Sequence, residues 1–315
     1  MGKFFSRGGA AVLAATGFLL STPGDVQAQQ PMPRWVVGFA QDTLGNDWRR
    51  AQTEGLAAAF AHHPEVRFIH TDAGGNTAQQ VQDIQSLVSE GVDVLITSPR
   101  DAELMAPVIE RVRAQGIPVV LLSRRTSSDA HTSFIRADNR EIARQAARHL
   151  AERLKGQGSI LVLQHIPTTS VAMERTEGFF EELKKYPGLS VVAMKRADSL
   201  RDKAILAIEE ALAEGLRFDA IYAQSDSMAS GARAALRRAG IDPGSLPIVG
   251  IDYIAEAREA IRKGEQDASF RYPTFAEEGA EITLRILRGE AVPHEVVVDS
   301  VKVTRDNVER IAPIF

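Results

Sequence analysis

The chain has 315 residues, of which 44% are hydrophobic and 25% are charged, and its formal net charge is −4. This length suggests about two domains, and the absence of a basic excess gives no indication of nucleic-acid binding. Cysteine is absent, which excludes disulfides, zinc–thiolate sites and cysteine nucleophiles.

The N-terminal segment has the pattern of a secretory signal. Lys3 and Arg7 precede an apolar run over residues 10–20, and Val26-Gln27-Ala28 follows as a cleavage site. We expect cleavage after Ala28 and export to the periplasm; an uncleaved membrane anchor is the alternative. The run is short for a bilayer span, and no later segment has the length and apolarity to cross a membrane.

Strand-like apolar runs alternate with helical patterns along the rest of the chain. Most runs are continuous and not alternating, as in strands that are covered on both faces. The expected strands are residues 36–40, 66–70, 92–97, 118–122, 132–135, 159–164, 190–194, 220–224, 247–251, 268–272 and 295–303. Several helical segments end in a glycine that we expect to be left-handed: Gly91, Gly116, Gly215, Gly240 and Gly264.

Alternating strands and helices predict parallel sheets with right-handed crossovers. Eleven strands in one open sheet would be unusual, so we predict an α/β protein with two Rossmann-like lobes. Residues 134–139 are the expected first crossing between the lobes, and a long helix over residues 140–155 begins the second lobe. No linker rich in Pro, Gly or Ser separates the halves, which predicts short, strand-like hinges.

Polar and aromatic side chains gather at the ends of the expected strands, where parallel sheets bind ligands. They include Asn46, Trp48, Arg49, Asp101, Arg124, Arg175, Ser225, Asp226, Asp252 and Tyr272. Carboxylates accept hydrogen bonds from sugar hydroxyls, guanidinium groups donate them, and an indole covers the C–H face of a sugar ring. The set therefore suggests a polyhydroxylated ligand.

Simpler interpretations of single residues stay open. Asp101, Asp226 and Asp252 each stand where a helix starts, so each carboxylate could serve only as a helix cap. A single arginine is usually solvated at the surface, and Trp48 could be an ordinary core residue.

Several segments, taken together and in order, carry a family resemblance. They include Val36-Val37-Gly38-Phe39, Ile135-Arg136-Ala137-Asp138-Asn139, Arg175-Thr176-Glu177-Gly178-Phe179, Ala223-Gln224-Ser225-Asp226 and Val249-Gly250-Ile251-Asp252. From Arg34 to Val303 the chain resembles the periplasmic sugar-binding proteins of the ribose-binding type. They have the type I fold, which they share with the effector domains of lactose-repressor-like regulators.

The resemblance implies two lobes that close over one sugar, with three crossings of the chain between them. It implies an N-terminal lobe of residues 34–136 plus 273–301 and a C-terminal lobe of residues 137–272 plus 302–315. From the first lobe it implies sugar contacts at Asn46, Trp48, Asp101 and Arg124. From the second lobe and its last crossing it implies contacts at Arg175, Ser225 or Asp226, Asp252, and Tyr272.

The chain also departs from the ribose-binding pattern. Trp48-Arg49 stands where ribose-type members often have two phenylalanines, and it looks more like the galactofuranose-binding branch. Ser123-Arg124 replaces a common Asp-Arg pair. These differences favour a sugar other than ribose, and the number of arginines leaves an anionic or phosphorylated sugar open.

Other function classes lack their motifs. The chain contains no His-Glu-x-x-His, no Gly-x-Ser-x-Gly and no phosphate-cradling loop, so we expect no enzyme, no metal and no cofactor. A transcription regulator would need a DNA-binding helix pair where the signal stands.

We therefore expect a monomer that binds a pentose or hexose, in pyranose or furanose form, and delivers it to an ABC-type membrane permease. The main alternative is a sensor that presents its closed form to a membrane receptor or sensor kinase. A carbohydrate-acting enzyme is the second alternative.

Overall fold

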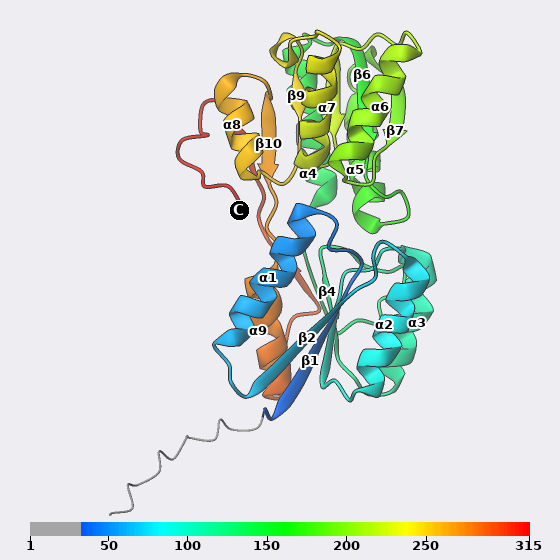
Figure 1. The fold of residues 1–315 in the computed structure, drawn as a ribbon, viewed down its shortest axis with the longest axis vertical. Coiled ribbons are helices and arrows are strands. Elements are labelled where there is room, and N and C mark those ends of the chain that lie inside the picture. Colours follow the sequence, from blue (N-terminus) through cyan, green and yellow to red (C-terminus); the bar gives the residue numbers. More distant parts are fainter. Residues whose placement is uncertain (1–32) are drawn as a thin grey trace, which may run out of the picture. The chain divides into compact units, whose positions relative to one another are not determined.

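The computed structural model describes residues 33–315, and the predicted signal over residues 1–28 lies outside them. The described residues form two sheets of six strands each. All strand pairs are parallel except β10 with β12. The predicted α/β class with two mostly parallel sheets is confirmed (Figure 1).

The first sheet has the strand order β11-β5-β4-β3-β1-β2. Helices α1 and α9 cover one face of it, and helices α2 and α3 cover the other (Figure 1). Its strands are β1 (Trp35–Gln41), β2 (Val66–Asp72), β3 (Val94–Thr97), β4 (Val119–Leu122), β5 (Ser133–Arg136) and β11 (Glu295–Val297). Its helices are α1 (Asp47–Ala61), α2 (Thr77–Ser89), α3 (Ala102–Ala114) and α9 (Ala276–Leu287).

The second sheet has the strand order β12-β10-β9-β8-β6-β7. Helices α4 and α5 pack on one face, and α6 and α7 pack on the other. Its strands are β6 (Gln157–Gln164), β7 (Gly188–Arg196), β8 (Ala220–Ala223), β9 (Ile248–Val249), β10 (Ala268–Arg271) and β12 (Val301–Thr304). Its helices are α4 (Asn139–Arg153), α5 (Ser170–Leu183), α6 (Arg201–Ala213), α7 (Asp226–Arg238), the short η1 (Pro243–Ser245) and α8 (Ala255–Lys263).

The central strands follow directly from their sequences. Every residue of β3, β4 and β8 is buried, as expected for continuous apolar strands with helices on both faces. The five glycines that were predicted to end helices have φ between 74° and 83°, which confirms the left-handed conformation.

One expected strand is wrong. Residues 295–303 do not form a single strand, because β11 pairs with β5 of the first sheet whereas β12 pairs with β10 of the second. The chain therefore leaves one sheet and enters the other between residues 297 and 301. It passes between the sheets at two further places, from β5 to α4 and from β10 to α9.

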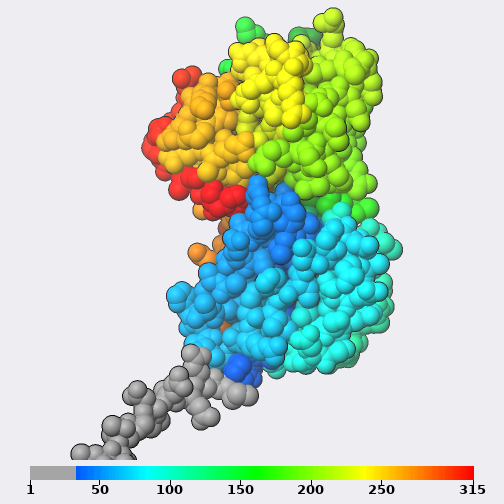
Figure 2. Space-filling view, in the orientation of Figure 1, coloured from blue at the N-terminus to red at the C-terminus, as the bar shows by residue number. Residues whose placement is uncertain are grey.

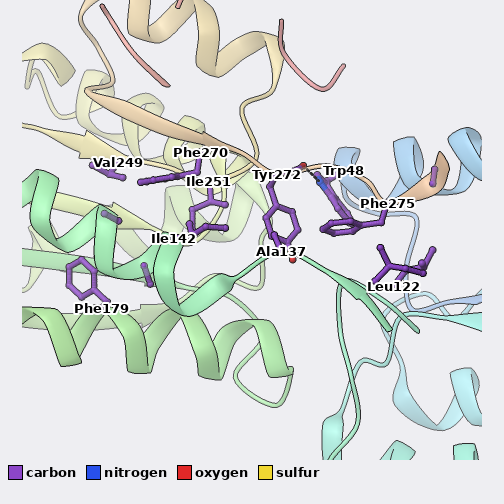
Figure 3. Close-up of a cluster of buried hydrophobic side chains, with 14 of the residues drawn as sticks. Trp48, Leu122, Ala137, Ile142, Phe179, Val249, Ile251, Phe270, Tyr272 and Phe275 are labelled. Atoms are coloured by element: carbon purple, nitrogen blue, oxygen red, sulfur yellow. Dashed lines mark hydrogen bonds between the residues drawn. The ribbon is translucent and has the colours of Figure 1, made fainter. Parts of the chain in front are cut away.

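The hydrophobic core continues across these passages. Tyr272 lies between the sheets, with its ring centroid 5.7 Å from that of Trp48 and 5.2 Å from that of Phe275. Figure 3 shows Tyr272 and Ala137 between two groups of side chains: Trp48 and Phe275, at helices α1 and α9, and Phe270 and Ile251 on the side of the second sheet. The passages are thus packed segments and not loose linkers. Within residues 33–315, no helix combines the length and apolarity that a bilayer span requires.

Candidate ligand-binding site

A cavity of about 600 Å³ lies where the carboxyl ends of strands from both sheets face each other. This is the edge at which open parallel sheets bind ligands, and the volume is within the range of small-molecule sites. The lining residues are Thr43, Gly45, Asn46, Trp48, Arg49, Gly74, Gly75, Arg100, Ser123, Arg124, His165, Ile166, Val171, Arg175, Asp198, Ser199, Leu200, Asp202, Lys203, Ser225, Asp252 and Tyr272.

The segment from β1 into α1 forms one wall of the cavity. Asn46 caps α1 by accepting from the backbone N–H of Arg49, and its Nδ2 donates to the carbonyl of Ser199 at 2.6 Å. In Figure 2 the blue surface of this segment abuts the green surface of the other half of the molecule. Trp48 is buried and donates from Nε1 to the carbonyl of Tyr272 at 3.2 Å. Asn46 and Trp48 therefore join this wall to segments that belong to the second sheet or lead from it.

Three arginines from α1 and from the loops after β3 and β4 converge on one buried carboxylate, Asp42. Arg124 Nη1 donates to Asp42 Oδ2 at 2.8 Å. Arg100 Nη1 lies 3.4 Å from Oδ2, and Arg49 Nε lies 3.4 Å from Oδ1. Arg49 also donates to Ser98 Oγ at 2.7 Å, and its guanidinium lies 4.8 Å from the Trp48 ring centroid. Asp42 thus holds three guanidinium groups at the cavity.

The pKa shifts follow from this crowding of charge. Burial alone would raise the pKa of Asp42, but Arg124, Arg49 and Arg100 lower it overall. Burial and repulsion from Arg124 lower the pKa of Arg49 to about 9, which leaves it charged at neutral pH. Burial and the nearby arginines hold the pKa of His165 well below its usual range, so this imidazole is neutral. The cavity therefore has a positive potential.

Arg175 and Asp252 lie on the opposite wall, which the second sheet supplies. Arg175 Nε donates to Asn139 Oδ1 at 3.0 Å, Nη1 donates to the Gln224 carbonyl, and the guanidinium lies 4.6 Å from the Tyr272 ring centroid. Burial raises the pKa of Asp252 to about 8, although Arg175 opposes the shift. A carboxyl group with this pKa can donate as well as accept a hydrogen bond at neutral pH.

Strained backbone gathers at the cavity. Of the seven described non-glycine residues with positive φ, four line it: Ser123 (66°), Asp198 (53°), Ser199 (62°) and Asp252 (125°). Such conformations cost roughly 1–3 kcal/mol each and concentrate at functional sites. Their position supports a functional role for the cavity independently of its charge.

The structure brings eight of the ten sequence-predicted residues to this cavity: Asn46, Trp48, Arg49, Arg124, Arg175, Ser225, Asp252 and Tyr272. Asp101 is not among the lining residues, because its carboxylate caps α3 by accepting from the N–H groups of Glu103 and Leu104. Asp226 accepts from Gln266, Ser269 and the Tyr253 N–H, below the cavity surface. Ligand contact by any of the ten stays a prediction.

Sequence reasoning did not select several residues that the structure places at or beneath the cavity. Asp42 directly follows β1, so its position at a strand end was a usable signal. Arg100 and His165 likewise follow strands of the two sheets. Asp198 on the β7–α6 connection pairs at 2.6 Å with Lys203 at the start of α6, and no sequence motif marks either residue. Across residues 33–315, no cluster of three or more acidic or histidine side chains could hold a metal ion.

Comparisons with known proteins agree with this architecture. Residues 37–291 match the profile of the protein family described as "periplasmic binding protein domain". A xylitol-binding protein of Mycolicibacterium smegmatis is 27% identical over 253 residues, which cover 79% of this chain and 72% of that protein. The ribose import binding protein RbsB of Salmonella typhimurium is 28% identical over 270 residues, covering 85% and 90% of the two chains.

Among solved structures, the fructose-binding periplasmic domain of a hybrid two-component system superposes with a TM-score of 0.83 at 31% identity. The match covers 87% of this chain and 92% of that domain. The resemblance that the sequence predicted is confirmed by these matches.

Proposed function

The chain belongs to the family of periplasmic binding protein domains, and from that premise we propose that it binds a small sugar, a pentose or a hexose. The observation that carries the proposal is the cavity between the two sheets, which eight of the ten sequence-predicted residues line. Relatives named for xylitol, ribose and galactofuranose are each 27–28% identical to this chain, so identity does not select one sugar among them.

The chemistry of the cavity suits a polyol. Arg49, Arg124 and Arg175 supply fixed N–H donors, Asn46 offers an amide, and Asp252 offers a carboxyl group. Each sugar hydroxyl both donates and accepts hydrogen bonds, so such a mixture of groups can satisfy several hydroxyls at once. The rings of Trp48 and Tyr272 provide apolar surface for the C–H groups of the sugar.

We propose that ligand binding is coupled to the closure of two lobes. The N-terminal lobe comprises residues 34–136 and 273–301, and the C-terminal lobe comprises residues 137–272 and 302–315. Three short passages of chain connect the sheets, which is the arrangement of a hinge. Contacts across the cavity mouth would hold the closed form, among them Asn46 with Ser199 and Thr168 Oγ1 with the Arg100 carbonyl at 3.2 Å.

For the cellular role, we propose a monomer without enzymatic activity that is exported by the signal over residues 1–28 and delivers its sugar to an ABC-type permease in the periplasm. A sensor that presents the closed form to a membrane receptor is the second candidate, because the fructose-binding domain of a hybrid two-component system is 31% identical. Uptake of the labelled sugar by cells with and without the gene separates the roles: uptake falls only if the protein serves transport.

The binding proposal is tested by a thermal-shift screen of the mature protein against neutral pentoses, hexoses, sugar acids and sugar phosphates, followed by calorimetry on each hit. A ligand that binds only the folded state raises the melting temperature. Arg175→Ala should lose most of the affinity, since removing one partner of a buried charged hydrogen bond costs about 2–5 kcal/mol. Arg217→Ala removes an exposed arginine and serves as the matched control. Folded, ligand-free protein that binds no compound in the screen would contradict the proposal.

A further inference from the structure

The interior of the cavity carries more positive than negative charge. Four guanidinium groups line it, those of Arg49, Arg100, Arg124 and Arg175, and all but Arg100 are buried. Two buried carboxyl groups face these arginines, Asp42 and Asp252, whereas the buried Asp198 pairs with two other cations, Lys203 and Arg196. With both carboxyl groups ionised, the interior still has an excess of two positive charges.

The charged residues at the rim of the cavity do not offset this excess; they are Arg196, Asp198, Asp202 and Lys203. Lys203 pairs with Asp198 at 2.6 Å, and Arg196 pairs with the same carboxylate at 2.5 Å. Asp202 adds one further carboxylate at the exposed edge. The rim therefore carries equal numbers of cations and anions, and solvent screens its exposed members. The uncompensated charge is confined to the buried part of the cavity.

Neighbouring polar groups cannot neutralise the guanidinium groups either. His165 lies beside Arg124, with Nε2 3.3 Å from Nη2, but its imidazole is neutral and brings no negative charge. Ser98 and Gln52 accept from Arg49, and Asn139 and Gln224 accept from Arg175, all through neutral oxygens. Buried charges without a counter-charge are costly, and native proteins normally pair them.

The arginines also keep donors available. Arg49 uses Nε and Nη1 toward Asp42, Ser98 and Gln52, whereas its Nη2 makes no hydrogen bond within residues 33–315. Arg175 uses Nε and Nη1, and its Nη2 likewise makes none in that range. Both residues line the cavity from opposite walls. Guanidinium N–H groups form their strongest hydrogen bonds with carboxylate and phosphate oxygens.

We propose that the ligand is an anionic sugar, with a carboxylate or phosphate group that supplies the negative charge missing from the arginine cluster. This inference rests on the proposed sugar-binding function and narrows its ligand class. The sugar hydroxyls meet Asn46, Asp252 and the aromatic rings, while the anionic group lies among the guanidinium groups.

The test compares matched sugars by calorimetry: D-ribose with D-ribonate and D-ribose 5-phosphate, and D-galactose with D-galacturonate, D-galactonate and D-galactose 6-phosphate. We expect at least one anion to bind 10-fold or more tightly than its neutral parent, with affinity that falls as salt increases. The acid and phosphate arms distinguish the two sources of charge. A neutral parent that binds as tightly as its anions overturns this inference and leaves the sugar-binding proposal standing. No binding by any member of the panel overturns both.

A variant gives an independent readout. Arg100 is the most exposed arginine of the cluster and lies 3.4 Å from Asp42, which keeps its shorter contact with Arg124, so Arg100→Gln should fold normally. We expect it to reduce the ratio of anion to neutral-sugar affinity by about 10-fold, whereas the control Arg217→Gln leaves the ratio unchanged. An unchanged ratio in Arg100→Gln contradicts the role assigned to the arginine cluster.

Discussion

Replacing Asp42 with asparagine removes the one carboxylate that Arg49, Arg100 and Arg124 share. The amide keeps an oxygen that can accept from Arg124, so the packing is conserved and only the charge is lost. Because Asp42 is fully buried, solvent cannot reach this position to screen the three guanidinium charges once the carboxylate is lost. We therefore expect Asp42→Asn to destabilise the ligand-free protein strongly.

The magnitude follows from the geometry. Breaking a buried ion pair by removing one partner costs about 3–5 kcal/mol, because the other charge is left without compensation. Here three guanidinium groups lie within 3.4 Å of the same carboxylate, so we expect the upper part of that range. The arginines lower the pKa of Asp42, so the stabilisation is complete above its ordinary pKa of 3.8 and is lost as the pH falls below it.

Urea unfolding of both proteins at neutral pH measures this difference. The matched control is Glu281→Gln, an exposed carboxylate on α9, for which we expect less than about 0.5 kcal/mol. If Asp42→Asn loses no more free energy of unfolding than Glu281→Gln, Asp42 does not neutralise the arginines and our account of the cluster's charge is wrong.

Three further predictions concern other parts of the fold. Burial raises the pKa of Asp252 to about 8, so the folded state loses stability as the pH rises from about 4 to 8. Asp252→Asn removes this titration, so in urea unfolding its stability relative to wild type should rise by a few kcal/mol across that pH range. A difference between the two proteins that does not change with pH would argue against the pKa shift. Asn46→Ser should keep the N-cap of α1 and therefore the melting temperature of the protein. It should weaken sugar binding in calorimetry, because the serine side chain cannot reach the Ser199 carbonyl. An unchanged affinity would show that the contact between residue 46 and Ser199 does not hold the closed form. A Cβ at Gly178 of α5 would clash with the Arg140 carbonyl of α4, so Gly178→Ala should lower the free energy of unfolding by about 1–3 kcal/mol, while Met173→Ala on the same helix has little effect. Equal stabilities of the two variants would contradict the close packing of α4 on α5.

The sheets could be predicted from the sequence because their strands are continuous apolar runs between helices that end in glycine. Val94–Thr97 and Val119–Leu122 are buried throughout, and Gly91 and Gly116 end the preceding helices with positive φ. The segment over residues 295–303 was misjudged because an apolar pattern does not reveal which sheet each half pairs with. Val297 and Val301 are only four residues apart but belong to different sheets.

The position of the cavity was predictable because parallel strands place their carboxyl ends at one edge, and residues that follow these ends in both sheets line the cavity. The direction of each side chain was not predictable. Asp101, Asp226 and Asp252 all follow strand ends, yet only Asp252 lines the cavity. The possible capping role of Asp252 is wrong, because α8 starts three residues later and has Ile254 as its N-cap. Asp101 caps its own helix, and Asp226 accepts from three groups of its own half. Such choices depend on tertiary packing, which local sequence does not specify.

Fluorescence of Trp48 tests the central claim, that a sugar binds between the sheets, most directly. The chain has two tryptophans, and Trp35 starts β1 at the strand end opposite the cavity. In Trp35→Phe, the emission should therefore come from Trp48 alone. We predict a saturable change in this emission when the sugar identified by calorimetry is added, with the same dissociation constant. Emission that stays constant while calorimetry records saturation would place the sugar elsewhere and contradict our account.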